Sequence, residues 1–269
     1  MKFALNYSTP AAKLLLQKKI TLDLFKCTDW DDMVASALAL LPSYVHFPLN
    51  VGQGDIGDLD RAADFAKRTG TSLFNTHCRP GIAGDPFQDV IRDLNLVSAR
   101  FGADCVTTEN LPYPMGSHPW AVEGIMPEFL HRVLCATGCG LLLDLAHARM
   151  AAEGLGLDPF KYISQLPVTQ LRELHVVGVG RDPAGLPLDH SPMSDLDWGL
   201  FDWALSEISS GQWRTPEIVS CEYGGEGEIF RKRSDPLVIE SQIPRMYHAV
   251  RDTREKMGLM PDGTEAAER

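Results

Sequence analysis

Histidine, glutamate and aspartate residues recur at the ends of short β-rich runs in this chain. In order along the sequence, the residues at or within two positions of the ends of these runs are His46, His77, Glu109, Asp144, His175 and Glu222. Polar side chains are costly to bury without partners, so residues that converge from neighbouring strands are expected to satisfy one another through metal ions or hydrogen bonds. Imidazole and carboxylate groups are ligands for zinc, iron and manganese. The pattern therefore predicts a site for two or three metal ions.

Two shorter patterns add candidates to this set. Asp144 and His147 are three residues apart and would face one site if a helix begins there. Asp189 and His190 follow the seventh run, and the sequence leaves open which of them ligates metal. Glu109 and Glu222 are the candidates to bridge ions, because one carboxylate can hold two cations. The predicted ligands are His46, His77, Glu109, Asp144, His147, His175, Asp189, His190 and Glu222, and the candidate catalytic residues are Glu109, Glu222 and His175.

The elements that must position these residues alternate between β-rich runs and amphipathic helical stretches, which is the order of a parallel sheet. The predicted strands are Lys2–Asn6, Leu22–Cys27, Tyr44–Phe47, Ser72–His77, Cys105–Glu109, Gly140–Leu145, Glu173–Val177 and Glu217–Glu222. The predicted helices are Ala11–Lys18, Trp30–Leu41, Leu59–Arg68, Pro86–Phe101, Pro127–Thr137, Pro159–Leu166, Leu200–Ser209 and Pro236–Met257. Eight such units predict an α/β fold, a single (β/α)8 TIM barrel with its site at the C-terminal ends of the strands.

The length of 269 residues suits one barrel domain, which we assign to residues 1–260, followed by a flexible tail at 261–269. A doubly wound open sheet is the alternative architecture. It is disfavoured because Asn6-Tyr7-Ser8-Thr9-Pro10 follows the first run, where dinucleotide-binding folds have a glycine-rich phosphate loop.

Composition narrows the function classes. The net charge of −11, from 36 acidic and 25 basic residues, disfavours nucleic acid as a partner. No apolar stretch approaches the roughly 18 residues of a membrane span, so no membrane association is expected. Six cysteines without CxxC pairs are typical of reduced thiols, and we expect a cytoplasmic protein.

Some residues keep two interpretations at this stage. Cys27 and Cys221 are either inert buried thiols or groups beside the metals. Asn75 and Asn110 either orient neighbouring ligands or serve the turns that follow the strands. Lys26 is either a proton-transfer group, as in metal-dependent isomerases, or an ion-pair partner for the carboxylates.

The order of the predicted ligands resembles the pattern of the xylose isomerase-like TIM barrel superfamily, which includes sugar isomerases and apurinic endonucleases that bind three zinc ions. Closer likeness is to the multinuclear non-heme iron-dependent oxidase family, the methanobactin-maturase-like enzymes that modify cysteines in ribosomally made peptides. Three segments carry that likeness: Thr108–Tyr113 with its Glu-Asn pair, Leu141–Asp144, and Leu174–Gly178. The stretch from His190 to Trp198 also resembles a family segment. One departure is His147, where the oxidases commonly have an Asn-Asn pair.

The resemblance implies two or three iron ions held by the predicted ligands, with zinc or manganese as the alternative. It implies oxidative modification of a peptide cysteine or a small thiol by dioxygen, and a partner protein that presents the peptide. A divalent-metal-dependent isomerase or epimerase of a sugar or hydroxy-carbonyl compound is the second hypothesis, and Glu109 and Glu222 would then also exchange protons with substrate. A phosphodiester hydrolase acting on damaged DNA is less compatible with the charge, and a barrel that only binds a ligand does not explain so complete a set of polar residues.

Overall fold

The protein is described here from a computed structural model, which covers residues 1–114, 120–227 and 233–259. The strands are β1 (Lys2–Asn6), β2 (Leu24–Cys27), β3 (Ser43–Val45), β4 (Leu49–Val51), β5 (Phe74–Cys78), β6 (Val106–Glu109), β7 (Gly140–Asp144), β8 (Leu171–Val176), β9 (Gly178–Arg181), β10 (Pro187–Ser191) and β11 (Ile218–Cys221). The α-helices are α1 (Thr9–Leu16), α2 (Asp31–Leu38), α3 (Leu59–Thr69), α4 (Pro86–Phe101), α5 (Pro127–Thr137), α6 (Leu145–Leu155), α7 (Pro159–Ile163), α8 (Asp195–Ser209) and α9 (Pro236–Lys256).

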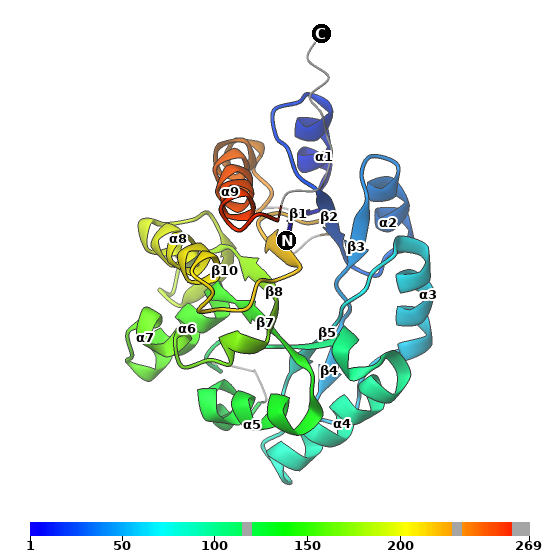
Figure 1. The fold of residues 1–269 in the computed structure, drawn as a ribbon, viewed down its shortest axis with the longest axis vertical. Helices are drawn as coiled ribbons and strands as arrows, with labels where there is room; N and C mark the ends of the chain where they lie inside the picture. The colour runs from blue at the N-terminus through cyan, green and yellow to red at the C-terminus, as the bar shows by residue number, and fades with distance from the viewer. Residues whose placement is uncertain (115–119, 228–232, 260–269) are drawn as a thin grey trace.

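Nine of these strands form one parallel sheet that curls into a barrel. The order around the sheet is β3-β2-β1-β11-β8-β7-β6-β5-β4. Its two ends, β3 and β4, belong to one segment of chain interrupted at residues 46–48, and this segment pairs with β2 on one side and with β5 on the other. The sheet therefore closes as a barrel of eight strand positions, with the helices around its outside (Figure 1). The predicted α/β TIM barrel is confirmed.

The interruption in the third strand position is the main departure from the predicted strands. The sequence predicts one strand over Tyr44–Phe47, whereas β3 ends at Val45 and β4 begins at Leu49. Pro48 lies between them and lacks the N–H that a continuous ladder requires. His46 lies in this gap, so its side chain is not fixed by regular strand alternation.

The helices agree closely with the sequence where a strong start signal exists. Helices α4 and α5 have the predicted bounds, and both begin at a proline, which suits the first helical position. Helix α6 was not predicted as an element. Helix α8 begins at Asp195, five residues before the predicted bound of Leu200, and Ser194 and Asp197 form a capping box there.

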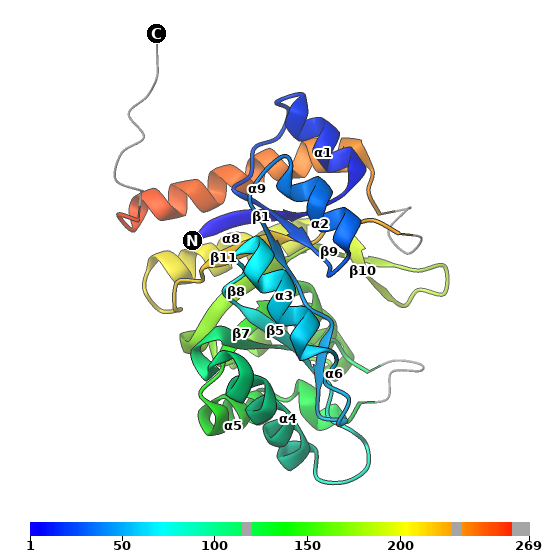
Figure 2. The same ribbon diagram turned by 90° about the vertical axis from the view of Figure 1, so that its right-hand side faces the viewer.

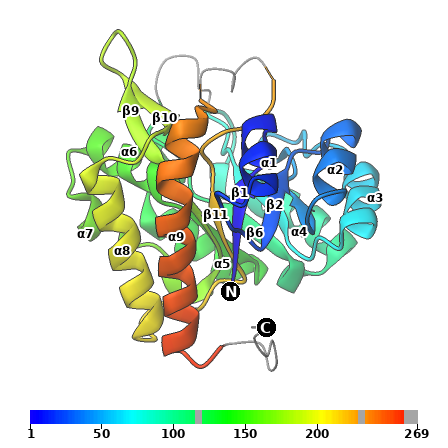
Figure 3. The ribbon, with the colours of Figure 1, turned by 90° about the horizontal axis from the view of Figure 1, so that it is seen from above.

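A second element was missed in the connection after β8, where the sequence predicts a loop. Strands β9 and β10 form an antiparallel hairpin there. Figures 2 and 3 show this hairpin projecting from the barrel, and Figure 3 places it at the end of the barrel opposite the N-terminus. The C-terminal ends of the barrel strands lie at this same end, because β1 starts at the N-terminus and its sheet is parallel. The hairpin thus rises beside the predicted site.

Among the described residues, no helix is both long and apolar enough to cross a membrane. The predicted tail at 261–269 lies outside the described residues.

Candidate metal centre

Three residues from neighbouring strand positions form the first group of possible metal ligands. His46 follows β3, His77 lies in β5 and Glu109 ends β6. Nε2 of His77 is 3.2 Å from Nε2 of His46 and 3.4 Å from Oε2 of Glu109. Two ligands that lie about 2.1 Å from one ion are separated by about 3 Å when they bind at right angles. His77 Nδ1 donates to the carbonyl of Leu49 at 3.1 Å, which leaves Nε2 with its lone pair directed at the group.

Glu109 also belongs to a second group, with Asp144 and His147. Its Oε1 lies 3.2 Å from Nδ1 of His147, while its Oε2 faces the two histidines of the first group. Asp144 and His147 meet because β7 passes directly into α6: the Asp144 carboxylate accepts a hydrogen bond from the backbone N–H of His147 at 2.8 Å. The spacing of three residues is therefore that of a helix N-cap and its partner, and it places both side chains at the mouth of the barrel.

Asp144 is shared in turn with a third group, which contains His175 and Glu222. Nδ1 of His175 lies 3.0 Å from Oε1 of Glu222 and 4.0 Å from Oδ2 of Asp144. A fourth group, made of His46, Glu173 and His175, shares His46 with the first group and His175 with the third, so the four groups form one connected cluster. Glu109 and Asp144 are the carboxylates common to two groups, whereas Glu222, which we had expected to bridge, belongs to one.

Asp189 and His190 reach the same cluster from the β9–β10 hairpin. Oδ2 of Asp189 lies 3.2 Å from Nε2 of His147, and Nδ1 of His190 lies 2.9 Å from the carbonyl oxygen of Glu222. Adjacent residues of a regular strand point to opposite faces. Here the register shifts between Leu188 and Ser191, and His190 has a φ of 54°, so both side chains turn to one side. The sequence left open which of Asp189 and His190 faces the cluster, and in the structure both do.

Unpaired buried oxygens show that these residues fit metal ions. Oε2 of Glu109 and Oδ2 of Asp144 are buried and have no hydrogen-bond partner among the described residues, a costly state for a carboxylate. Burial raises the pKa of Asp144 to about 7, with further contributions from Glu222 and Asp189 that outweigh the opposing charge of His147. Burial also raises the pKa of Glu109, but the hydrogen bond from His147 and the charge of His77 outweigh it and bring the pKa to about 2. A bound cation would supply the partner that both oxygens lack.

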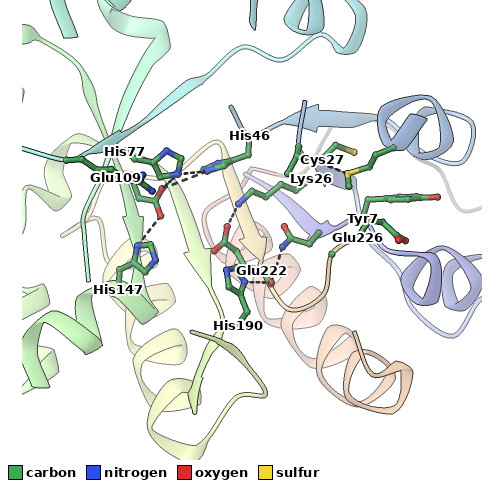
Figure 4. Close-up of a pocket in the computed structure, with 15 residues that line it drawn as sticks. Tyr7, Lys26, Cys27, His46, His77, Glu109, His147, His190, Glu222 and Glu226 are labelled. Carbon is green, nitrogen blue, oxygen red and sulfur yellow. Dashed lines mark hydrogen bonds and ion pairs between the residues drawn. The ribbon is translucent and has the colours of Figure 1, made fainter. Parts of the chain in front are cut away.

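Lys26 at the end of β2 forms the ion pair that the sequence allowed. Its Nζ contacts Oε1 of Glu222 and lies 3.3 Å from Nε2 of His175, and its side chain is 5% exposed. Figure 4 shows Lys26 extending from the far wall to Glu222, opposite His190. The positive charge of Lys26 compensates Glu222, whereas the cationic groups that act on Glu109 and Asp144 are histidines.

Asn75 and Asn110 have a structural role that combines both interpretations from the sequence. The amide of Asn75 accepts from the backbone N–H of Phe47 at 2.6 Å and donates to its carbonyl at 2.9 Å, which ties the interrupted strand position to β5. Nδ2 of Asn75 also donates to Nε2 of His46 at 3.0 Å. Asn110 exchanges the same two bonds with the backbone of Asp144, at 3.0 and 2.8 Å. Each asparagine thus replaces a pair of strand hydrogen bonds beside a candidate ligand.

Two buried residues below the cluster were missed by the sequence analysis. Glu173 lies 2.8 Å from Nε2 of His175 through Oε1, and the hydroxyl of Tyr44 donates to the same oxygen at 2.7 Å. Both precede a predicted ligand by two residues, Glu173 before His175 and Tyr44 before His46. Because residues two apart share a strand face, this spacing was the available signal. Glu173 orients the His175 ring so that Nδ1 faces the cluster.

A cavity of about 290 Å³ opens onto the cluster. Figure 4 shows His46, His77, Glu109, His147, His190 and Glu222 along one side, and Tyr7, Cys27 and Glu226 on the other. Cys27 belongs to none of the ligand groups, and burial raises the pKa of its thiol to about 12. Cys221 is also buried and its pKa is likewise raised to about 12, by burial first. Both thiols are therefore protonated near neutral pH, in keeping with inert buried cysteines.

The fold and the cluster together are those of a TIM barrel with a candidate site for metal ions at its C-terminal face. Residues 109–212, less than half of the chain, match the family model described as "RiPP precursor modification enzyme MbnB/TglH/ChrH". The resemblance drawn from the sequence is thereby confirmed: over residues 109–212 this chain is similar to that family. The description of that family model is of an enzyme.

Curated relatives match a short part of the chain. A "UPF0276 protein" of Caulobacter vibrioides is 32% identical over 85 residues, which is 30% of this chain and 30% of that protein. A "UPF0276 protein" of Bordetella pertussis is 31% identical over 85 residues, 29% of each. The matched stretch thus spans about a third of the length of these relatives.

Solved structures resemble nearly the whole chain in fold. D-allulose 3-epimerase from Methylomonas sp. covers 95% of this chain and 98% of its own, with a TM-score of 0.56 and 12% identity. An IOLI protein with a bound zinc atom covers 98% of this chain and 100% of its own, with a TM-score of 0.51 and 14% identity. At such identities the likeness concerns the fold alone.

Proposed function

We propose that this chain is a multinuclear iron-dependent oxidative enzyme that modifies the cysteine of a peptide or a related thiol. The observation that carries the proposal is the position of the family match. The matched residues 109–212 contain six of the nine predicted ligands, and these six lie in the connected cluster or in contact with it. The six are Glu109, Asp144, His147, His175, Asp189 and His190.

Within this proposal the cluster has three positions for ions. The first ion would be held by His46, His77 and Glu109. The second would be held by Glu109, Asp144 and His147, and the third by Asp144, His175 and Glu222. Asp189 contacts His147 of the second group, and His190 contacts the backbone of Glu222 in the third. When bound, iron supplies an open position for the substrate thiolate and for dioxygen, and it relays electrons from the thiol to dioxygen, which is the oxidant. The residues of the chain hold the ions, compensate their charge and shape the cavity.

The proposed substrate enters through the cavity of about 290 Å³ beside the cluster. This volume is at the lower end for ligand sites, which are typically about 300 to 1,000 Å³. It suits a small thiol or the reacting part of a peptide. Because a longer peptide would have to be held outside this cavity, we also propose that a partner protein presents it.

A second candidate function is isomerisation or epimerisation of a small sugar or hydroxy-carbonyl compound. The observation that favours it is Lys26, whose Nζ lies in the cavity wall against His175 and Glu222. A lysine beside metal-bound carboxylates can transfer protons to and from substrate carbon or oxygen. The two functions use the same ligand set but differ in their metal and in their need for dioxygen.

Metal content tests the proposal directly. The protein is purified without oxygen and without added metal, and its metals are measured by elemental analysis and electron paramagnetic resonance. Two or three irons per chain are expected, and Glu109→Gln should remove at least one of them because Glu109 faces two groups. Glu128→Gln is the matched control, since Glu128 is exposed at the start of α5.

Activity then separates the two candidates. Iron-loaded protein given a cysteine-containing peptide should consume dioxygen, and mass spectrometry should show a changed peptide mass. Zinc or manganese in place of iron, with turnover of a ketose in the absence of oxygen, would refute the oxidase and support the isomerase.

A further inference from the structure

Arg79 lies in the cavity wall beside the metal cluster. It directly follows β5 and comes two residues after His77, so both side chains lie on the same side of the chain. The backbone N–H of Arg79 still donates to the carbonyl of Val51 at 2.8 Å, which continues the pairing of β4 with β5. The cavity is lined by both His77 and Arg79. The strand thus delivers the guanidinium to the space next to a candidate ligand.

The guanidinium of Arg79 has no anionic partner within the described parts of the chain. No carboxylate there lies within 4.0 Å of it, and its Nε is buried without a hydrogen-bond acceptor. Other partly buried arginines are paired: Arg149 with Asp197 at 2.6 Å and Arg172 with Glu217 at 2.8 Å. In a chain of net charge −11, an unpaired arginine in a cavity wall is a donor site for an anion.

Trp120 lies against this side chain. The guanidinium carbon of Arg79 is 5.7 Å from the centroid of the Trp120 ring, within the range of a cation–π contact. Such a contact leaves the N–H groups of an arginine available for a planar, bidentate acceptor such as a carboxylate. Trp120 therefore stabilises the guanidinium beside the cavity before a ligand arrives.

Lys26, another cation of the cavity wall, is already neutralised. It forms its ion pair with Glu222, so its charge is used within the protein. Arg79 lies two residues after His77, and both side chains line the same cavity. An anion bound at Arg79 would therefore lie close to His77, at the edge of the first ligand group.

From these contacts we propose that Arg79 binds a carboxylate of the substrate and so holds the substrate with its reacting group toward the metal cluster. The proposal rests on the proposed function, because it assigns the substrate class of that same site: a thiol that also carries a carboxylate a few bonds away. The cavity volume of about 290 Å³ accommodates a molecule of this size.

Binding of matched small probes tests this role. 3-Mercaptopropionate and 3-mercaptopropionamide share the thiol and differ in charge, and their dissociation constants are measured by calorimetry on anaerobic, metal-containing protein. A charged hydrogen-bond pair predicts that the acid binds at least about tenfold more tightly than the amide. Arg79→Gln should abolish this preference by weakening the acid and should change the amide less than about twofold. Arg79→Lys should retain part of the preference for the acid, because lysine keeps the positive charge but lacks the planar guanidinium that donates two parallel hydrogen bonds.

Arg245→Gln is the matched control for loss of a stacked arginine. Arg245 also packs on a tryptophan, with its guanidinium carbon 3.8 Å from the Trp198 ring, but it is paired with Asp202 and does not line the cavity. This variant should keep the preference for the acid. Thermal unfolding followed by circular dichroism identifies any variant that fails to fold. If Arg79→Gln fails, Arg79→Lys is compared with the original protein instead.

Glycolate and glycolamide separate failure of this proposal from failure of the proposed function. If neither thiol probe binds while glycolate is preferred over glycolamide in an Arg79-dependent way, the carboxylate site stands and the thiol oxidase is refuted. If both thiol probes bind equally well and Arg79→Gln changes neither, the carboxylate site is refuted while a thiol-binding centre stands. If inorganic phosphate binds at Arg79 as tightly as the carboxylate probes in a competition titration, the assignment to carboxylate would also be overturned.

Discussion

Replacing the Asp144 carboxylate by an amide should stabilise the protein when metal is absent and weaken it when metal is present. In the metal-free state Asp144 is fully buried, and its Oδ2 has no hydrogen-bond partner among the described residues. Asp144→Asn keeps an oxygen that can accept from the backbone N–H of His147, as Oδ1 does now at 2.8 Å. The substitution therefore removes a charge and preserves the helix cap.

The magnitude follows from the raised pKa of Asp144, about 7 against an ordinary value of 3.8. A carboxyl group whose pKa is raised in the folded state destabilises the fold progressively as pH rises from the unfolded pKa to the folded one, and by a constant amount above it. The cost is about 2 kcal/mol at pH 5 and about 4 kcal/mol at pH 8, at about 1.4 kcal/mol for each unit of pKa. Asp144→Asn should recover up to these amounts.

The assay is urea unfolding followed by circular dichroism in the presence of a chelator, at pH 5 and at pH 8. The gain in the free energy of unfolding should be larger at pH 8. With metal restored, the sign should reverse, because the amide is a poorer ligand and the stabilisation by bound metal shrinks. Such a reversal identifies a ligand and is not expected of a residue that serves the fold alone.

Asp93→Asn is the control for this experiment. Asp93 is also buried, but its carboxylate accepts from the backbone N–H groups of Gly52 and Gly54 at 2.8 and 3.0 Å and pairs with Arg92. Asp93→Asn should destabilise the protein at both pH values, with and without metal. A metal-free Asp144→Asn protein that is no more stable than the original at pH 8, or a gain that does not grow with pH, would refute the reasoning.

Three further predictions follow from single contacts. Asn110→Ala removes two buried hydrogen bonds to the backbone of Asp144 and should lower the free energy of unfolding by about 2 to 3 kcal/mol; a loss below 0.5 kcal/mol in a urea titration would contradict this role. Gly178→Ala would place a Cβ 2.0 Å from the carbonyl oxygen of Pro192, and this clash should displace the β9–β10 hairpin. The metal content measured by elemental analysis should then fall, and an unchanged metal content would show that the hairpin contributes no ligand. Maleimide at pH 7 should label exposed Cys135 and spare buried Cys27, whose pKa of about 12 keeps it protonated; mass spectrometry of peptides would reveal the opposite order.

The sequence by itself determined the fold class and most of the candidate ligands. Eight apolar runs alternate with helical stretches, and each run is long enough to form one strand of a barrel. The alternation can therefore be recognised from the local sequence alone. Polar residues at the ends of those runs also stand out locally, because the interior of a parallel sheet is otherwise apolar. His46, His77, Glu109, Asp144, His175 and Glu222 were found in this way, and the structure brings all six into four overlapping groups, one of which also contains Glu173.

Only the tertiary structure decided how these residues are divided and supported. Glu109 and Asp144 are shared because the strands that carry them are neighbours at a specific register, β6 beside β7 and β7 beside β8. Asp189 and His190 face one side because a bulge breaks the alternation of β10, and a bulge has no reliable local signal. Glu173 and Arg79 gain their roles from what surrounds them: Glu173 contacts His175 below the cluster, and Arg79 meets no carboxylate in the described chain. Burial and the identity of distant neighbours are properties of the folded chain, and the order of residues alone does not fix them.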